Sequence, residues 1–236
     1  MKKLVVFFTK KEKIKPNPED GFYMLSYSQE GEDMVLSRLF GDKKSGTFVD
    51  IGAHHPFRFS NTYFFYKKGW RGINVDPLPN SKELFDKHRP EDTNLCIGVS
   101  SIESQLNYFM FNEPALNTFS ETEAHLKNGL HDGKYYIIDK IKIQTKKLST
   151  ILDEYLSSKE IDFLSIDVEG LDMEVLESND WERYRPKVIL VEELRNNITT
   201  IIENSNIYHF LKNKGYSLYY RTFNTSFYVD NNCDNK

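Results

Sequence analysis

Short apolar segments alternate with amphipathic segments along most of this chain, and this alternation limits the possible fold more than any other feature. In the first half, strands are predicted at Thr47–Ile51, Gly72–Asp76 and Leu95–Val99, with helices at Ser60–Lys68 and Asn80–His88 between them. The strand segments are mostly apolar runs, which is typical of parallel strands buried on both faces. Repeated strand–helix units predict an α/β fold with a mostly parallel sheet covered by helices on both faces.

The same order returns in the second half. Helices are predicted at Ser149–Leu156, at Leu171–Leu176 and through Ile201, Ile202, Phe210 and Leu211 up to Gly215. Strands are predicted at Phe163–Val168, Val188–Glu192, Ser217–Arg221 and Phe227–Asp230. Asn224 and Thr225 separate the last two strands, so these are expected to pair as a hairpin that adds one antiparallel strand.

Local signals indicate where several helices begin and end. A first helix carries Val35, Leu36, Leu39 and Phe40 at helical spacing and is expected to end at Gly41. Ser60 is the expected cap of the helix that follows the first strand. Asn80 and Glu83 have the spacing of a capping box.

Two parts of the chain depart from the alternation. Residues 1–25 are predicted to be an N-terminal extension, in which Leu4–Phe8 is a short edge strand or a frayed end. Residues 26–236 are predicted to form a single domain. Within it, residues 112–139 are polar and irregular, between two segments whose apolar residues alternate as in antiparallel strands. We expect this insertion to select the substrate, because long loops on a rigid scaffold often carry specificity.

Composition excludes several classes of protein. The chain has 31 Lys and Arg against 35 Asp and Glu and a net charge of −4, so it has no basic excess to bind nucleic acid. Its two cysteines, Cys96 and Cys233, have neither disulfide-framework nor zinc-site spacing. They fit a reducing compartment, and a cytoplasmic location is expected. The longest early apolar run, Leu4–Phe8, is too short for a membrane span.

The segment FVDIGAHHP, Phe48–Pro56, carries the sharpest local signal for a ligand. A strand leads into Asp50 and Gly52, and Asp76 ends the next strand, where an acid is the usual acceptor for ribose hydroxyls. The run G-x-G-x-x-G is absent, so the loop is a poor cradle for a pyrophosphate. A nucleoside without phosphate fits better, and S-adenosylmethionine is one. The structural alternative is that Asp50 and Gly52 merely end a strand.

The segment IDVEG, Ile166–Gly170, carries the second signal. Asp167 lies where the carboxyl edge of the sheet is expected to face the ligand, and Glu169 follows two residues later. The structural alternative is that one of these acids caps the helix that begins near Leu171. The two carboxylates could also offer oxygen ligands to magnesium or calcium, although two acids alone do not assign a metal site.

Six motifs in order resemble those of the FkbM-type methyltransferases, a branch of the S-adenosylmethionine-dependent class. They are SQEGED (Ser28–Asp33), FVDIGAHHPFRFSNTYFFYKKGWRGINVDP (Phe48–Pro77), IGVS (Ile97–Ser100), LSTILDEYL (Leu148–Leu156), IDFLSIDVEGLDMEVL (Ile161–Leu176) and PKVILVEE (Pro186–Glu193). The resemblance implies a Rossmann-like sheet of about seven strands whose last strand is antiparallel. It also implies an O-methyltransferase, often one that acts on sugars or other polyhydroxylated metabolites.

The resemblance also implies roles for individual residues around the cofactor. Asp50 and Gly52 would line its methionine end, and Asp76 would hold the ribose. Ile51 and Pro77, next to these residues, are also expected to contact the cofactor. Gly98, Val99 and Ser100 would lie by the adenine. Asn61 would approach from the following helix, and Gln29 and Glu32 would close the site from the N-terminal helix.

The predicted reaction is methyl transfer from S-adenosylmethionine to a hydroxyl of a sugar, either nucleotide-activated or a surface-polysaccharide precursor. An alcohol is a weak nucleophile, so a base is expected, with Asp167 first, His54 second and Glu169 and Glu192 as further acids at strand ends. Three alternatives stay open: another small metabolite as acceptor, an NAD-type oxidoreductase, and a nucleotide-binding protein without catalysis. The oligomeric state is open as well.

Overall fold

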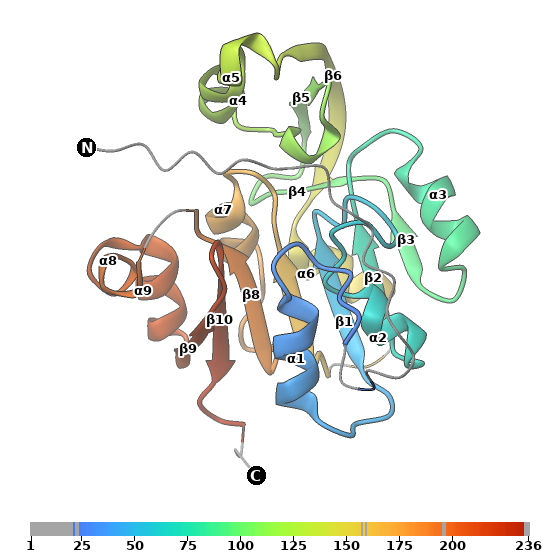
Figure 1. Cartoon of the computed structure of the whole chain (residues 1–236), viewed down its shortest axis with the longest axis vertical. Helices are drawn as coiled ribbons and strands as arrows, with labels where there is room; N and C mark the ends of the chain where they lie inside the picture. The colour runs from blue at the N-terminus through green and yellow to red at the C-terminus, as the bar shows by residue number, and fades with distance from the viewer. Residues whose placement is uncertain (1–20, 22–23, 157, 159, 195–196, 234–236) are drawn as a thin grey trace.

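The computed structural model describes residues 21, 24–156, 158, 160–194 and 197–233 (Figure 1). The segment Leu4–Phe8 and most of the predicted extension 1–25 lie outside these residues, so both interpretations stay predictions. In the part of the chain that is described, no helix has the length and apolar character needed to cross a membrane.

A seven-stranded sheet forms the centre of the molecule, with the order β3-β2-β1-β7-β8-β10-β9. The strands are β1 (Thr47–Ile51), β2 (Arg71–Val75), β3 (Thr93–Leu95), β7 (Phe163–Ile166), β8 (Val188–Glu192), β9 (Tyr216–Arg221) and β10 (Thr225–Asp230). All neighbours pair in parallel except β10, which is antiparallel to both β8 and β9. The predicted fold class is therefore confirmed, including the closing hairpin.

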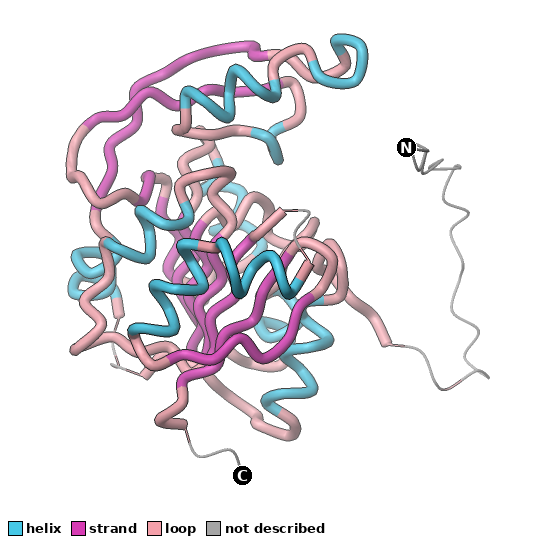
Figure 2. Tube along the Cα trace, turned by 90° about the vertical axis from the view of Figure 1, so that its left-hand side faces the viewer, coloured by secondary structure: helices cyan, strands magenta, loops and turns pink. Residues whose placement is uncertain are grey.

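Helices pack around this sheet (Figures 1 and 2). They are α1 (Glu32–Phe40), α2 (Tyr63–Lys67), α3 (Ser81–His88), α6 (Leu148–Tyr155), α7 (Asp172–Glu177), α8 (Ile198–Asn204) and α9 (Asn206–Asn213). Successive strand residues face opposite sides of the sheet. Phe48 therefore packs in one core with Leu36 of α1 and Phe65 of α2, whereas Val49 packs in another with residues of α6, α7 and α9. Burial on both faces explains why the central strands are mostly apolar.

The predicted insertion stands on a second, three-stranded sheet with the order β4-β6-β5. Its elements are β4 (Gly98–Val99), β5 (Gln105–Phe111), η1 (Pro114–Leu116), α4 (Glu121–Lys127), α5 (Leu130–Gly133) and β6 (Ile137–Lys146). The antiparallel pairing of β5 with β6 agrees with the alternation in the sequence. Residues 112–139 are less irregular than expected, since they fold into short helices, and Phe109, Phe111 and Ala124 form a small core of their own. Figure 1 shows this unit at the top of the molecule.

The third predicted strand, Leu95–Val99, is wrong as a single element. β3 ends at Leu95, and the chain then leaves the large sheet so that Gly98 and Val99 pair with β6 instead. A short apolar run carries no information about which sheet it joins, because pairing in the seven-stranded sheet and pairing in the three-stranded sheet can both bury it.

Three predictions about helix ends need correction. Asn80 has a left-handed φ of 68° and makes no cap hydrogen bond, so the capping box does not form. The helix expected from Ser60 begins at Tyr63, whose backbone N–H donates to Ser60 Oγ at 3.0 Å. The C-terminal helix is two helices, because Ser205 breaks it and caps the second by accepting a hydrogen bond from Tyr208 N at 3.1 Å.

Candidate active site

Parallel register brings the predicted acids to one edge of the sheet. Ile51 pairs with Val75 on one side and with Ile166 on the other, and Ile166 pairs with Val191. The residues that follow these four are Gly52, Asp76, Asp167 and Glu192. Since the carboxyl ends of parallel strands meet at one edge, they form a row across the sheet, where ligands bind in open α/β folds.

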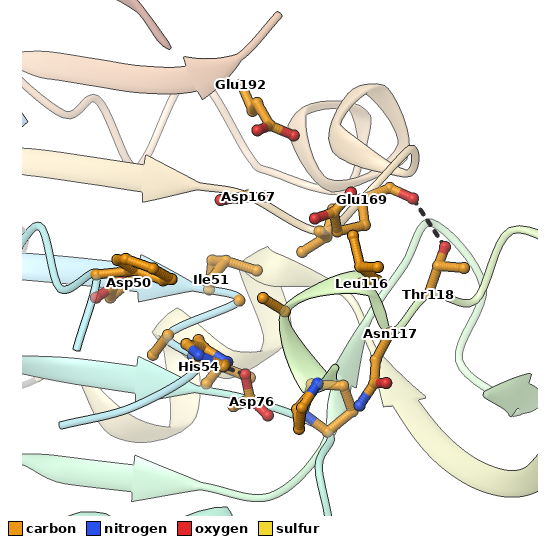
Figure 3. A pocket seen from close by; sticks show the side chains of 18 of the residues that line it. Asp50, Ile51, His54, Asp76, Leu116, Asn117, Thr118, Asp167, Glu169 and Glu192 are labelled. Atoms are coloured by element: carbon orange, nitrogen blue, oxygen red, sulfur yellow. Dashed lines mark hydrogen bonds between the residues drawn. The ribbon is translucent and has the colours of Figure 1, made fainter. Parts of the chain in front are cut away.

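A cavity of about 440 Å³ opens at this edge, and Figure 3 shows it from close by. The predicted site residues that line it are Gln29, Asp50, Ile51, Gly52, His54, Asn61, Asp76, Pro77, Val99, Asp167 and Glu169. They come from sequence positions up to 140 residues apart. The fold thus brings together most of the residues that the motifs singled out.

Three predicted residues do not line the cavity. Glu32 is 2% exposed, and its carboxylate accepts hydrogen bonds from Thr222 and Thr225, which ties α1 to the β9–β10 turn. Ser100 is buried, and its backbone N–H donates to Lys146 O at 3.1 Å. Gly98 lies behind Phe119, since a Cβ atom at Gly98 would stand 2.6 Å from the Cζ atom of that ring.

Asp50 lies at the buried end of a hydrogen-bond relay. Its Oδ2 accepts from Thr62 Oγ1 at 2.9 Å, and Thr62 Oγ1 in turn accepts from Arg89 Nη1 at 2.9 Å. Burial raises the pKa of Asp50, and the charge of Arg89 opposes that shift. The relay fixes the Asp50 side chain at the cavity wall. It also brings the positive charge of Arg89 near Asp50 from the protein interior.

Asp76 is held by two backbone N–H groups. Its Oδ2 accepts from His54 N at 2.7 Å and its Oδ1 from Leu78 N at 2.8 Å. Burial raises the pKa of Asp76 to about 6 in spite of these hydrogen bonds. Each carboxylate oxygen has a second lone pair, so the group can still accept hydrogen bonds from a ligand.

His54 takes a left-handed backbone conformation with φ 55°, which aims its N–H at Asp76. Its ring lies over Phe59, and its Nε2 is 3.3 Å from Arg58 Nη1. Burial, followed by the charge of Arg58, lowers the pKa of His54 to about 4. The imidazole is therefore neutral at pH 7 but is a weaker base than an ordinary histidine.

Gly52 is required by the backbone of the neighbouring strand end. Its φ is 83°, and a Cβ atom there would stand 1.8 Å from the carbonyl oxygen of Asp167. This close approach locks the loops after β1 and β7 together. Gly52 also lines the cavity, so its role toward a ligand stays a prediction.

The capping interpretation of Asp167 and Glu169 is wrong. Helix α7 begins at Asp172, and no side chain caps it. Asp172 itself accepts hydrogen bonds from the backbone N–H groups of Val168 and Gly170, both at 3.3 Å. The loop is thereby held by Asp172, which leaves the Asp167 side chain open to the cavity.

Asp167, Glu169 and Glu192 form an acidic cluster whose carboxylate oxygens lie within 4.8 Å of one another. The Asp167 side chain is exposed to the cavity. The surrounding protein desolvates its carboxylate, and this desolvation and the charges of Glu192, Glu169 and Asp172 raise the pKa of Asp167. Burial and the other acids also raise the pKa of Glu192 to about 8. Closely spaced carboxylates cannot all ionise together, so the cluster retains a proton at neutral pH.

The insertion is bound to this cluster through Glu169. Lys127 of α4 forms an ion pair with the Glu169 carboxylate, and Thr118 Oγ1 donates to the Glu169 carbonyl at 2.8 Å. Burial raises the pKa of Glu169 and the Lys127 charge opposes it. The three carboxylates offer the oxygen ligands that magnesium and calcium prefer. Lys127 already places one positive charge beside them, through its ion pair with Glu169.

Sequence reasoning did not assign several residues of the cavity wall. They are Arg58, Phe59, Tyr108, Glu113, Pro114, Ala115, Leu116, Asn117, Thr118, Phe119, Tyr135 and Ser165. Glu192, which the sequence offered as a further acid at the carboxyl end of a buried strand, also lines the cavity. For the wall contributed by residues 113–119 the sequence carries no signal, since only the folded chain shows which part of the insertion turns inward.

Comparison with known proteins identifies a family. The sequence model of the methyltransferase FkbM domain matches residues 50–218. Among solved structures, a precorrin-6y C5,15-methyltransferase from Geobacter metallireducens is similar, with 12% identity over 89% of this chain and 93% of that chain and a TM-score of 0.39. No curated protein matches the chain in sequence.

Proposed function

The chain belongs to the FkbM methyltransferase family, and from this premise we propose that it transfers a methyl group from S-adenosylmethionine to a hydroxyl of a small acceptor. The observation that carries the proposal is the row of Gly52, Asp76 and Asp167 along one edge of the sheet, around one cavity. A volume of about 440 Å³ lies within the usual range for small-molecule sites, about 300–1,000 Å³.

The donor groups in the cavity fit this cofactor. Asp76 offers a free lone pair on each oxygen to the two ribose hydroxyls. Asp50 and the acidic cluster put negative charge near the methionine end, where the ammonium and sulfonium groups are positive. The cavity has no cradle of glycine N–H groups for a pyrophosphate, which argues against a dinucleotide.

The bound cofactor supplies a methyl group already activated on a sulfonium, so the protein mainly aligns the acceptor and takes up its proton. The acceptor oxygen forms its bond to the methyl carbon while the carbon–sulfur bond breaks and the electron pair stays on sulfur. Asp167 receives the hydroxyl proton. The raised pKa of Asp167 makes it a stronger base than an ordinary carboxylate. Alignment of the acceptor with the methyl group can lower the activation barrier by up to about 7–11 kcal/mol.

The acceptor that we propose is a sugar, nucleotide-activated or part of a surface-polysaccharide precursor. The resemblance of the motifs favours it, and the carboxylates of the acidic cluster can accept hydrogen bonds from neighbouring hydroxyls. Another small metabolite with a hydroxyl is the alternative. Incubation with activated sugars and S-adenosylmethionine, followed by mass spectrometry, tests the choice through a gain of one methyl group. A cytoplasmic location stays a prediction, and Cys96 and Cys233 are both free thiols.

Asp76→Ala is expected to weaken S-adenosylmethionine binding by about tenfold to a hundredfold, since hydrogen bonds to charged groups contribute about 1.5–3 kcal/mol. Isothermal calorimetry measures this change. Asp42→Ala, at an exposed acid outside the cavity, is the matched control and should bind as the wild type does. Unchanged affinity in Asp76→Ala would remove Asp76 from the ribose site. For the wild type, a thermal shift with NAD but not with S-adenosylmethionine would overturn the proposed cofactor.

The insertion is expected to select the acceptor. Replacing residues 120–134 by a short linker removes α4, α5 and Lys127 but keeps the cavity wall at 113–119. We expect acceptor turnover to fall below detection, while affinity for the cofactor changes by less than about twofold. Turnover by mass spectrometry and binding by calorimetry measure the two effects. If the shortened protein still turns over the acceptor, selection lies elsewhere.

A further inference from the structure

Asn117 lies in the insertion directly after η1 and lines the cavity. Its side chain is 7% exposed, so its polar atoms depend on partners inside the protein or on a ligand. Figure 3 shows it on the insertion side of the cavity, across from the strand ends that carry Asp50 and Asp76. Tyr108, which lies beside the Asn117 amide, is within electrostatic range of Asp76, so this part of the insertion borders the nucleoside side of the proposed cofactor site.

The two ends of the Asn117 amide are in different situations. The oxygen Oδ1 accepts a hydrogen bond from Phe111 N at 2.7 Å. This bond fixes the orientation of the amide and identifies its other end as the nitrogen Nδ2. The nitrogen Nδ2 has no hydrogen-bond partner of good geometry among the described residues. The Tyr108 hydroxyl lies beside the amide and can engage one of its two N–H groups at most. At least one buried donor is thus left for a ligand.

The segment around Asn117 is held so that the amide cannot turn away. Thr118 exchanges two backbone hydrogen bonds with Phe109, at 2.8 and 3.1 Å. Its side chain is bonded to the Glu169 carbonyl, as described above. On the far side, the Phe119 ring packs against Gly98 and lies 4.7 Å from the Tyr108 ring, centroid to centroid. A buried donor on a fixed segment is costly unless something accepts from it.

We propose that Asn117 Nδ2 donates a hydrogen bond to a ring nitrogen of the adenine of the methyl donor. Asn117 lines the same cavity as Asp76, the proposed ribose acceptor, and as Tyr108 and Phe119, whose ring packs on Gly98 where the resemblance of the motifs puts the adenine. Adenine ring nitrogens accept hydrogen bonds, whereas the ribose hydroxyls are needed as donors to Asp76. The inference rests on the proposed function, because it assumes S-adenosylmethionine in this cavity.

The test compares S-adenosylhomocysteine with its 1-deaza, 3-deaza and 7-deaza forms, in each of which one ring nitrogen becomes C–H. With the wild type, calorimetry should show one of the three analogues binding about fivefold to a hundredfold more weakly than the parent. Asn117→Asp keeps an acceptor for Phe111 N but loses the donor, so it should bind that analogue and the parent about equally. Asn117→Ser is a second variant in case the first fails to fold.

Asn179→Asp is the matched control, because Asn179 is another buried asparagine with an unpartnered atom but lies outside the cavity. It should discriminate among the analogues as the wild type does. If the wild type binds all four ligands equally, or if the Asn117 variants still discriminate, the inference is overturned. If the wild type binds neither S-adenosylmethionine nor S-adenosylhomocysteine, the proposed function itself fails, and the two outcomes are distinct.

Discussion

Asp167→Asn is expected to lower turnover by about a hundredfold or more, the usual scale of general acid–base catalysis, without loss of folded structure. Asn has nearly the same shape as Asp but cannot take up the proton of the acceptor hydroxyl. Asp167 makes no cap for α7, so its replacement breaks no helix end. Turnover is measured by mass spectrometry at saturating S-adenosylmethionine, and cofactor affinity should change little by comparison.

The pH dependence separates chemistry from structure. The pKa of Asp167 is raised, so in the wild type kcat/KM should rise with pH through a range above that of an ordinary carboxyl. A raised carboxyl pKa means that the folded state loses stability as the pH rises through it, because ionisation is then less favourable than in the unfolded chain. Asp167→Asn removes this loss, so Tm should rise more at pH 8 than at pH 5.

Two outcomes would contradict this assignment. A folded Asp167→Asn protein with full turnover removes Asp167 from the mechanism. Loss of wild-type turnover on treatment with EDTA, restored by magnesium, would make Asp167, Glu169 and Glu192 metal ligands instead. Glu154→Gln, at an exposed acid on α6 outside the cavity, is the control for general effects of charge.

Arg89→Met is expected to lower the free energy of unfolding by about 3–5 kcal/mol, because it leaves a buried carboxylate without its counter-ion. The side chains of Arg89 and Asp92 are both 0% exposed, and Arg89 Nε donates to Asp92 Oδ2 at 2.8 Å. The guanidinium also donates to Thr62, which bonds Asp50 in the cavity wall. Cofactor affinity should therefore fall as well. Urea denaturation followed by circular dichroism measures the stability.

The matched control is Arg183→Met, because Arg183 pairs with Asp153 on the surface, where the two side chains are 46% and 42% exposed. Exposed pairs contribute about 0–1 kcal/mol, so this variant should lose far less. Adding Asp92→Asn to Arg89→Met should recover part of the lost stability, since a neutral amide needs no counter-ion. If Arg89→Met and Arg183→Met lose equally little, the buried pair is not what holds this part of the fold.

The order of strands and helices and the edge at which the site lies could be predicted from the sequence. Apolar runs, their spacing and the glycines after helices act over a few residues, and such local signals survive without knowledge of the fold. Acids that directly follow buried strands, such as Asp76 and Asp167, could be expected to meet because parallel strands share one carboxyl edge. The register confirms that these two positions lie in one row.

What the same residues do in three dimensions was decided by contacts between distant parts of the chain. Gly52 is required by the carbonyl of Asp167, 115 residues later in the chain. Neither Asp167 nor Glu169 caps α7, which was the structural alternative for these acids, and Asp172 instead holds the preceding loop. Residues 95–99 divided between two sheets. In each case the local pattern allowed two arrangements of similar energy, and tertiary packing selected one.

The cavity wall is the clearest example of a feature that only the tertiary structure determined. Asn117 and Thr118 lie in a polar segment in which no residue is distinguished by periodicity, yet both line the cavity and Thr118 is bonded to the Glu169 carbonyl. Thr118 is 51 residues from Glu169, and Arg89 is 27 from Thr62. Hydrogen bonds over such separations depend on how whole elements pack, whereas sequence signals report the preferences of neighbouring residues. The sequence by itself therefore determined the sheet and the edge at which its acids meet, and the packing of the insertion determined what faces them.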